Sequence, residues 1–209
     1  MPDRKPTGTA VAALVNEIRR RCHDLDRPFV VAVDGVSGAG KSTFCEALSR
    51  ILDVSIIPLD DFYSAHVPDA CWDEKSDAQR ALDVLDWNRI RREALAPLRA
   101  GRGARWQAFD FAAGARIDGT YGRSEENKRR LPSSVIVIDG AYSGHPKLAD
   151  IIDMTVLLEV PDRTRTARLA GREDPRTLQD WFHCWGDPEA WYMTTVRPRT
   201  SFDLVITTE

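Results

Sequence analysis

The residues with the most specific chemistry in this 209-residue chain lie in a glycine-rich segment at positions 35–43. The segment reads Gly-Val-Ser-Gly-Ala-Gly-Lys-Ser-Thr and matches the pattern G-x-x-x-x-G-K-[ST] in full. Glycines let the backbone curl until successive N–H groups point at phosphate oxygens. Lysine at position 41 reaches the β- and γ-phosphates of a nucleoside triphosphate, and the serine hydroxyl at position 42 binds Mg²⁺. The residues predicted to bind the nucleotide are Gly35, Ser37, Gly38, Ala39, Gly40, Lys41, Ser42 and Thr43.

The segments on either side of this loop are the ones that a phosphate-binding loop requires. Residues 28–35 form a nearly continuous apolar run rich in valine, which is typical of a strand covered on both faces in a parallel sheet. A helix is predicted from about position 41 to 52, so that its positive N-terminal end meets the phosphates. The order strand, loop, helix argues against a chance glycine-rich turn and predicts ATP and Mg²⁺ as ligands.

Two acidic residues follow other predicted strands. Asp139 ends the apolar run at residues 133–140, where a carboxylate in such a fold holds Mg²⁺ directly or through water. The alternative is an ordinary aspartate in a turn before glycine. Asp60 follows the run at residues 55–59 and is placed to orient or deprotonate an acceptor hydroxyl beside the γ-phosphate. Its alternative role is to cap a helix.

Arginines gather after the fourth predicted strand, residues 153–160. Arg165, Arg168 and Arg172 have the spacing of one helical face. A cationic face that closes over ATP would neutralise the transferred phosphoryl group and exclude water. The alternative is a solvated face paired with nearby acids. Lys41, Asp60, Arg168 and Arg172 are the predicted catalytic residues.

The remaining elements complete an α/β fold, a P-loop NTPase with a doubly wound, mostly parallel five-stranded sheet and an arginine-rich lid. We expect one domain over residues 1–209, with the lid at about 161–185. Residues 60–80 are predicted to be irregular, and residues 102–133 to form loops and a short hairpin. Helices are predicted at 9–25, 86–101 and 163–185, and the fifth strand at 202–208.

Composition excludes several classes of protein. The net charge is −3, so a nucleic-acid partner is not expected. No signal core and no apolar run of membrane-spanning length is present, so we expect no membrane partner. The four cysteines have no paired or metal-like spacing, which indicates the reducing cytoplasm. A homo-oligomer is left open.

The phosphate loop, Asp60-x-Phe-Tyr after the second strand and Asp139-Gly after the third together resemble the uridine kinase / phosphoribulokinase / pantothenate kinase family of P-loop kinases. The resemblance covers nearly the whole chain. It includes the Phe-Asp-Phe segment at 109–111, which is similar to the family's Tyr-Asp-Phe segment at the nucleoside site, and the arginine-rich lid. It implies ATP-dependent transfer of the γ-phosphate to a hydroxyl of a small metabolite.

Residue roles also follow from this resemblance. Asp60 matches the family's catalytic base, Tyr63 an acceptor-site aromatic, Phe109 an aromatic that contacts the base, and Asp139 a metal-associated carboxylate. A stretch that contains Asp73, Asp83 and Asp86 is similar to the region that holds the ribose hydroxyls, and Asp86 is the first choice there.

The chain also departs from the family pattern. Uridine and cytidine kinases carry a histidine that contacts the pyrimidine, whereas Ala-Ala-Gly stands at 112–114 here, and Phe109 lacks the usual tyrosine hydroxyl. A pocket without these groups selects a pyrimidine poorly. A nucleoside is the best-supported acceptor. A pantothenate-like or sugar acceptor, or an ATP-binding switch without an acceptor, are the alternatives.

Overall fold

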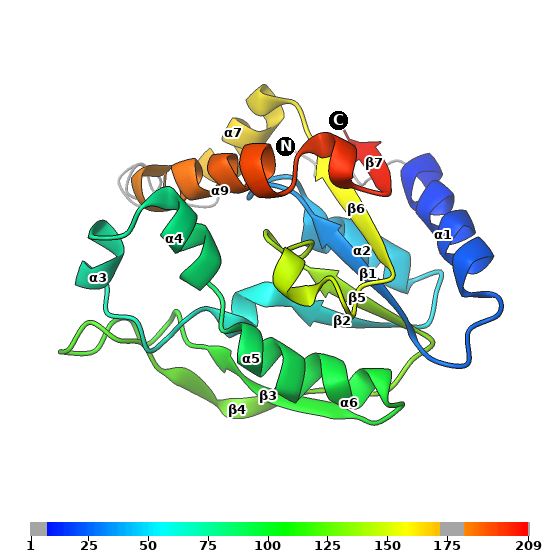
Figure 1. Ribbon diagram of the computed structural model, residues 1–209, viewed down its shortest axis with the longest axis horizontal. Coiled ribbons are helices and arrows are strands. Elements are labelled where there is room, and N and C mark those ends of the chain that lie inside the picture. The colour runs from blue at the N-terminus through cyan, green and yellow to red at the C-terminus, as the bar shows by residue number, and fades with distance from the viewer. Residues whose placement is uncertain (1–7, 172–181, 209) are drawn as a thin grey trace.

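The computed structural model describes residues 8–171 and 182–208, which form a parallel five-stranded sheet flanked by helices (Figure 1). The strand order is β2-β5-β1-β6-β7, and every adjacent pair of strands is parallel. This sheet confirms the fold class predicted from the apolar runs. Its strands are β1 (Phe29–Asp34), β2 (Val54–Pro58), β5 (Val135–Asp139), β6 (Met154–Glu159) and β7 (Leu204–Thr207).

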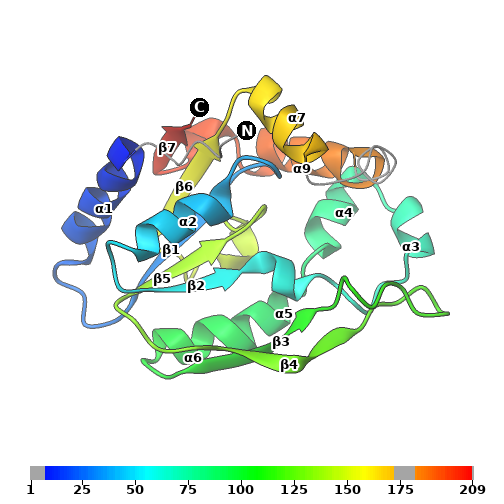
Figure 2. The same cartoon turned by 180° about the vertical axis from the view of Figure 1, so that it is seen from behind.

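Helices cover both faces of the sheet because its central strands are apolar on both sides. Helices α1 (Gly8–Cys22) and α2 (Lys41–Ser49) pack with Val31 and Val33 on one face. On the other face, Val30 packs against a helix built from α5 (Trp87–Arg89), η2 (Ile90–Leu95) and α6 (Ala96–Arg99). Figure 2 shows the α1 and α2 side from behind.

The helix of residues 87–99 continues through Pro97. Proline has no backbone N–H to donate to the residue four positions before it. The residue four positions before Pro97 lies within the wider π-helical turn Ile90–Leu95, where hydrogen bonds span five residues instead of four. The helix then continues to Arg99. Its apolar face stays continuous, with Ile90, Leu95 and Leu98 fully buried.

The topology brings three strand ends together. Asp139 at the end of β5 lies in register with Val33 of β1 on one side and with Pro58 of β2 on the other. The loop after β1, the turn after β2 and the end of β5 therefore meet at one edge of the sheet. Ligands of open α/β sheets bind at such an edge.

The region predicted to be irregular holds short helices: η1 (Leu59–Phe62), α3 (Ala70–Asp73) and α4 (Asp77–Asp83). Helix α4 begins with a capping box, in which Ser76 and Gln79 satisfy each other's backbone N–H groups. Further short helices are η3 (Pro146–Leu148) and η6 (Arg199–Ser201).

The predicted lid helix is described in part. Helix α7 (Asp162–Ala170) follows β6, and η4 (Phe182–Gly186), α9 (Asp187–Trp191) and η5 (Tyr192–Val196) form one further continuous helix beside α4. This second helix extends eleven residues beyond the predicted end of the lid, from 186 to 196. No described helix combines the length and the apolar character needed to cross a bilayer.

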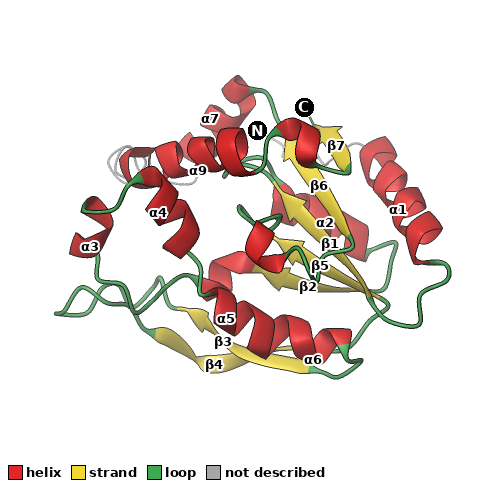
Figure 3. Ribbon diagram, viewed as in Figure 1, coloured by secondary structure: helices red, strands yellow, loops and turns green. Residues whose placement is uncertain are grey.

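A two-stranded antiparallel sheet of β3 (Ala104–Phe109) and β4 (Arg123–Arg130) lies outside the main sheet (Figure 3). The prediction of a hairpin in this region is confirmed, although its strands are longer than expected. The buried carboxylate of Asp61 attaches the hairpin to η1. It accepts hydrogen bonds from Trp106 Nε1 at 2.8 Å and from Lys128 Nζ at 2.6 Å.

The attachment through Asp61 gives a stability prediction. Asp61→Ala leaves the buried indole N–H of Trp106 without a partner and removes the ion pair to Lys128. We expect it to lower the free energy of unfolding by about 2–3 kcal/mol, measured by urea denaturation. Asp61→Asn keeps an acceptor for the indole and is expected to lose less. Equal losses for the two variants would contradict this account.

Candidate active site

The phosphate-binding loop adopts backbone angles that only glycine tolerates easily. Gly35 has a φ of 142° and Gly40 a φ of 91°. A Cβ atom at Gly35 would lie 2.4 Å from the carbonyl oxygen of Leu158, so no other residue fits there. Helix α2 begins at the residue after Gly40. Lys41 folds back over the loop and donates from Nζ to Gly35 O at 2.8 Å and to Val36 O at 3.1 Å.

Two arginines of α7 contact this loop. Arg165 Nε donates to Ser37 O at 2.9 Å, and an Arg168 guanidinium nitrogen donates to Ala39 O at 3.0 Å. The start of the predicted lid thus lies against the phosphate loop. Arg172 lies outside the described residues. The role of these arginines in catalysis stays a prediction.

Asp139 lies beside the loop with Lys41, Ser42 and Asp60. Burial raises the pKa of Asp139, while the charge of Lys41 and a hydrogen bond from Ser42 lower it, and the Asp60 charge raises it. Oδ1 of Asp139 is buried and has no hydrogen-bond partner among the described residues. An orphaned carboxylate oxygen next to a hydroxyl suits Mg²⁺, which accepts oxygen ligands and also uses substrate phosphates.

This residue set fits a metal that is held partly by its nucleotide. In the described ranges, no three His, Cys, Asp or Glu side chains cluster in a way that could hold a metal ion. A Mg²⁺ site made of one or two protein oxygens plus phosphate oxygens needs no such cluster. Ser42 and Asp139 are the residues that would hold the ion.

The two consecutive aspartates after β2 point in different directions. Asp61 is 5% exposed and faces the hairpin, whereas Asp60 is exposed and accepts a hydrogen bond from Tyr63 Oη at 3.2 Å. Of the two carboxylates, Asp60 is therefore the one available to a bound acceptor. Its position next to Asp139 and the loop fits the predicted role in orienting a hydroxyl.

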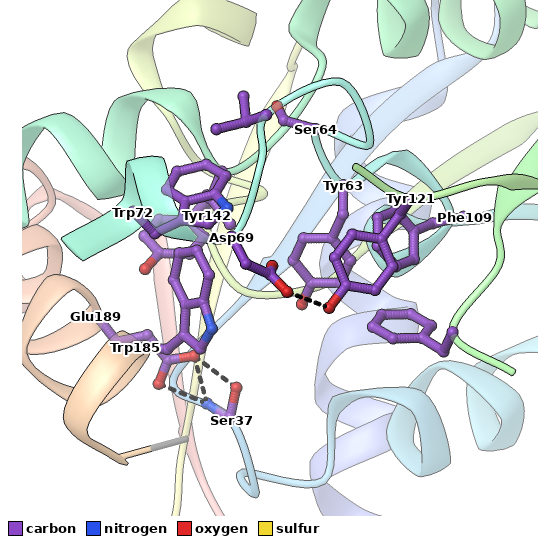
Figure 4. A pocket seen from close by; sticks show the side chains of 13 residues that line it. Ser37, Tyr63, Ser64, Asp69, Trp72, Phe109, Tyr121, Tyr142, Trp185 and Glu189 are labelled. Carbon is purple, nitrogen blue, oxygen red and sulfur yellow. Dashed lines mark hydrogen bonds between the residues drawn. The ribbon is translucent and has the colours of Figure 1, made fainter. Parts of the chain in front are cut away.

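A cavity of about 200 Å³ opens between this edge of the sheet, the hairpin and the helix of residues 182–196. Figure 4 shows the side chains that line it. Seven of them are aromatic, and Ser37 of the phosphate loop forms part of its wall. The lining residues are Ser37, Tyr63, Ser64, Val67, Asp69, Trp72, Val84, Phe109, Phe111, Tyr121, Tyr142, Trp185 and Glu189.

The aromatic side chains form two groups on either side of Asp69 (Figure 4). In one group Tyr63 meets Phe109 edge-to-face at 5.7 Å, and Phe109 lies 4.9 Å from Tyr121. In the other group Trp72 meets Trp185 edge-to-face at 5.0 Å. Two aromatic walls of this kind suit a flat organic ring.

The wall of tryptophans is held by a buried arginine of α4. Arg80 donates from Nε to Trp72 O at 2.9 Å and from a terminal nitrogen to Cys184 O at 3.0 Å. One side chain therefore ties α3 to the segment that carries Trp185. This contact explains how short helices that are far apart in the sequence hold a defined cavity.

Glu189 is a site residue that the sequence did not reveal. Its carboxylate is 4% exposed and accepts hydrogen bonds from the N–H of Ser37 at 3.0 Å, from the Ser37 hydroxyl and from Arg165 at 3.3 Å. Burial raises its pKa, and the charge of Lys41 together with the bonds from Ser37 lowers it. It has no local motif, so only the packing of α9 on the loop identifies it.

Asp86 does not lie with the other predicted acceptor residues. Its carboxylate caps α5 by accepting a hydrogen bond from Arg89 N at 3.1 Å, and it borders a different hollow. Asp83 pairs with Lys75 at 2.8 Å. The acidic residues that line the cavity are Glu189 and Asp69, and the carboxylate of Asp69 accepts a hydrogen bond from Tyr121 Oη at 3.0 Å.

Known proteins resemble this chain in sequence. A family model described as an AAA domain matches residues 31–181. Nicotinamide riboside kinase of Eremothecium gossypii is 30% identical over 181 residues, which is 78% of this chain and 70% of that protein. Uridine-cytidine kinase B of Dictyostelium discoideum is 26% identical over 70% of this chain.

The chain belongs to the uridine kinase-like family of P-loop kinases. The family predicted from the motifs is thereby confirmed, and with it a phosphotransferase that acts on a hydroxyl.

The uridine kinase-like fold extends over nearly the whole chain. A solved structure from Bacillus stearothermophilus, described as a "possible uridine kinase", has a TM-score of 0.67 at 17% identity and covers 95% of this chain and 97% of its own. At this identity the likeness concerns the fold alone. The chain spans 58% of uridine-cytidine kinase B and 34% of uridine-cytidine kinase A from Dictyostelium discoideum.

The position of Asp139 gives a prediction for this uridine kinase-like protein. Asp139→Asn removes a negative charge from the site assigned to Mg²⁺ while keeping its size. We expect the Mg²⁺ concentration for half-maximal ATP turnover to rise about 10–100-fold. Asp61→Asn is the control, because that carboxylate faces the hairpin. A Mg²⁺ requirement unchanged in Asp139→Asn would remove Asp139 from the metal site.

Proposed function

We propose that this chain transfers the γ-phosphate of ATP to a hydroxyl group of a nucleoside. The observation that carries the proposal is the aromatic cavity that ends at Ser37 of the phosphate loop. A nucleoside base fits between its aromatic walls, and the attached sugar then extends toward the loop and Asp60. A protein that used ATP only as a switch would need no such cavity.

A second cavity supports two separate substrate sites. It contains Val36, the loop residue next to Ser37, and is lined on its other sides by residues of β6, its following loop and the C-terminal part of the chain. Adjacent loop residues thus border different cavities. We assign the second one to the base of ATP and the aromatic one to the acceptor, with the γ-phosphate between them.

The site residues have distinct roles in this reaction. Asp60 orients the acceptor hydroxyl and accepts its proton. Lys41 and Arg168 stabilise the charge of the transferred group, and helix α7 with the residues up to about 185 forms the lid of a single domain. When bound, Mg²⁺ supplies further positive charge at the β- and γ-phosphates. The free thiols of Cys22, Cys45, Cys71 and Cys184 support the reducing cytoplasm as the place of the reaction.

The chemistry of the acceptor cavity favours a positively charged base. The described lining combines seven aromatic side chains with the carboxylates of Asp69 and Glu189 and contains no Lys or Arg. Arg165 pairs with Glu189, so Asp69 is the carboxylate whose charge remains to attract a cation. Aromatic faces attract a cation by about 0.5–2 kcal/mol. Nicotinamide riboside, whose pyridinium ring is flat and cationic, is therefore the acceptor that we expect.

One prediction of the proposed function concerns the carboxylate of Asp60. Asp60→Asn keeps the size and the hydrogen bond from Tyr63 but cannot accept a proton. We expect kcat to fall by about 10²-fold or more while the Kd for ATP stays within about twofold. Phosphorylated nucleoside is measured by chromatography and ATP binding by calorimetry. Full transfer activity in Asp60→Asn would show that the acceptor side is assigned wrongly.

Another prediction of the proposed function concerns the identity of the acceptor. Nicotinamide riboside is expected to exceed uridine and cytidine in kcat/KM by about tenfold or more, the ratio that corresponds to about 1.4 kcal/mol of cation–aromatic attraction. Its reduced form, which has the same size but an uncharged ring, is the matched control and should lose this advantage. A preference for uridine would contradict the cationic base. Transfer to a vitamin or sugar alone would replace the nucleoside and keep the kinase.

A further inference from the structure

Tyr142 has an unusual backbone conformation. Its φ is 68°, the only positive φ among the non-glycine residues that the structure describes. A side chain with a Cβ atom is strained in this region. Strained residues of this kind gather at ligand sites, where the surrounding structure holds them in place.

A buried carboxylate holds the loop that carries Tyr142. Asp34 Oδ1 accepts hydrogen bonds from Tyr142 N at 3.0 Å and from Gly35 N at 2.7 Å. Asp34 Oδ2 accepts from Gly144 N at 2.8 Å and from Tyr192 Oη at 2.7 Å. The strain at Tyr142 is thus offset by the hydrogen bonds that Tyr142 N and Gly144 N donate to Asp34, which fix the backbone that carries the side chain.

Tyr142 lines the acceptor cavity, and its phenol oxygen is buried without a partner among the described residues. The residue is 4% exposed, it lines the cavity, and its Oη makes no hydrogen bond within the described residues. Its ring packs edge-to-face on Tyr192 at 4.8 Å. A buried hydroxyl without a partner lowers stability, and phenylalanine would fill the same space without this cost. The hydroxyl is therefore expected to find its hydrogen-bond partner in a ligand that occupies the cavity.

The groups around Tyr142 suit one kind of ligand atom. Burial, with the nearby charges of Glu189 and Asp34, raises the pKa of Tyr142, so the phenol is neutral and can donate. Glu189 lines the same cavity and contacts Ser37 of the phosphate loop (Figure 4). A hydroxyl group both accepts and donates one hydrogen bond, and a phenol with a neighbouring carboxylate offers the two matching partners.

We infer that Tyr142 Oη, together with Glu189, binds a ribose hydroxyl of the acceptor that does not react, at position 2′ or 3′. This inference rests on the proposed nucleoside kinase function and names how that site recognises the sugar. Tyr142 then determines selectivity for ribose over deoxyribose, because a deoxy sugar leaves the phenol unpaired. Tyr142 also fixes the sugar so that its reacting hydroxyl meets Asp60.

The test compares Tyr142→Phe with the wild type on nicotinamide riboside or uridine and on the 2′-deoxy and 3′-deoxy forms of the same nucleoside. For the wild type, one deoxy form should have a kcat/KM about tenfold lower than the parent. Tyr142→Phe should lose about tenfold on the parent nucleoside and little on that deoxy form, with the KM for ATP unchanged. Its melting temperature should be equal to or above that of the wild type.

Tyr192→Phe is the matched control. It removes the same atom from the adjacent ring, but that hydroxyl is bonded to Asp34 rather than directed at the cavity. It should lower the melting temperature and keep the wild-type ratio of ribose to deoxyribose activity. This pair of variants separates recognition of the sugar from support of the fold.

Each result decides between the two proposals. A Tyr142→Phe variant with wild-type kinetics on all nucleosides, or with equal losses on the parent and both deoxy forms, would overturn the role of Tyr142 and leave the kinase intact. If the wild-type protein phosphorylates no nucleoside, the proposed function fails and this inference fails with it.

Discussion

The site depends on the buried carboxylate of Asp34, which lies at the end of β1 directly before the phosphate loop. Burial alone raises its pKa, and the hydroxyl of Tyr192, the N–H groups of Gly144 and Gly35 and the charge of Lys41 lower it. A buried charge is tolerated only when its lone pairs are satisfied. Here the donors come from the phosphate loop, from the loop after β5 and from η5. These three segments are far apart in the sequence, and one residue determines how they lie together.

This arrangement divides the site electrically at Ser37. On the side of α7, Lys41, Arg165 and Arg168 surround the loop with positive charge. On the other side the described cavity lining is aromatic and acidic. Phosphates and an organic acceptor therefore meet opposite environments a few residues apart. Glu189 lies at the boundary between the two sides. Its carboxylate accepts a hydrogen bond from Ser37 N and forms an ion pair with Arg165, so the negative charge of Glu189 and the positive charge of Arg165 partly cancel there.

The parts of this structure that the sequence predicted are those with strong local signals. The valine-rich runs located the parallel strands, because a strand that is buried on both faces is apolar along its whole length. The glycines of the phosphate loop at 35, 38 and 40 all adopt the positive φ that the motif requires.

The acceptor side was harder to predict. Strand β4 is almost entirely charged, the helix from Asp187 to Val196 contains Pro188 and threonines, and Asp69, Tyr142 and Glu189 belong to no motif. Only tertiary contacts bring these residues together, although the Ser76–Gln79 capping box was a recognisable signal for the start of α4. Asp86 precedes an apolar tryptophan, and an aspartate in that position can either cap a helix or bind a substrate hydroxyl. In the structure it caps α5.

The hairpin of β3 and β4 is anchored to the core at several points: Asp61 bonds Trp106 and Lys128, Arg89 donates to Gln107 O, and Trp106 is itself a core residue. The cavity walls that it contributes, Phe109 and Tyr121, lie at the connecting end, where β3 stops and β4 has not yet begun. A kinase built in this way can acquire a new acceptor by changing that end of the hairpin while the buried part, the sheet, the phosphate loop and Asp60 keep their places. Divergence of substrate choice within such a family then requires changes chiefly where the chain is most tolerant of them, and the machinery for ATP is inherited unaltered.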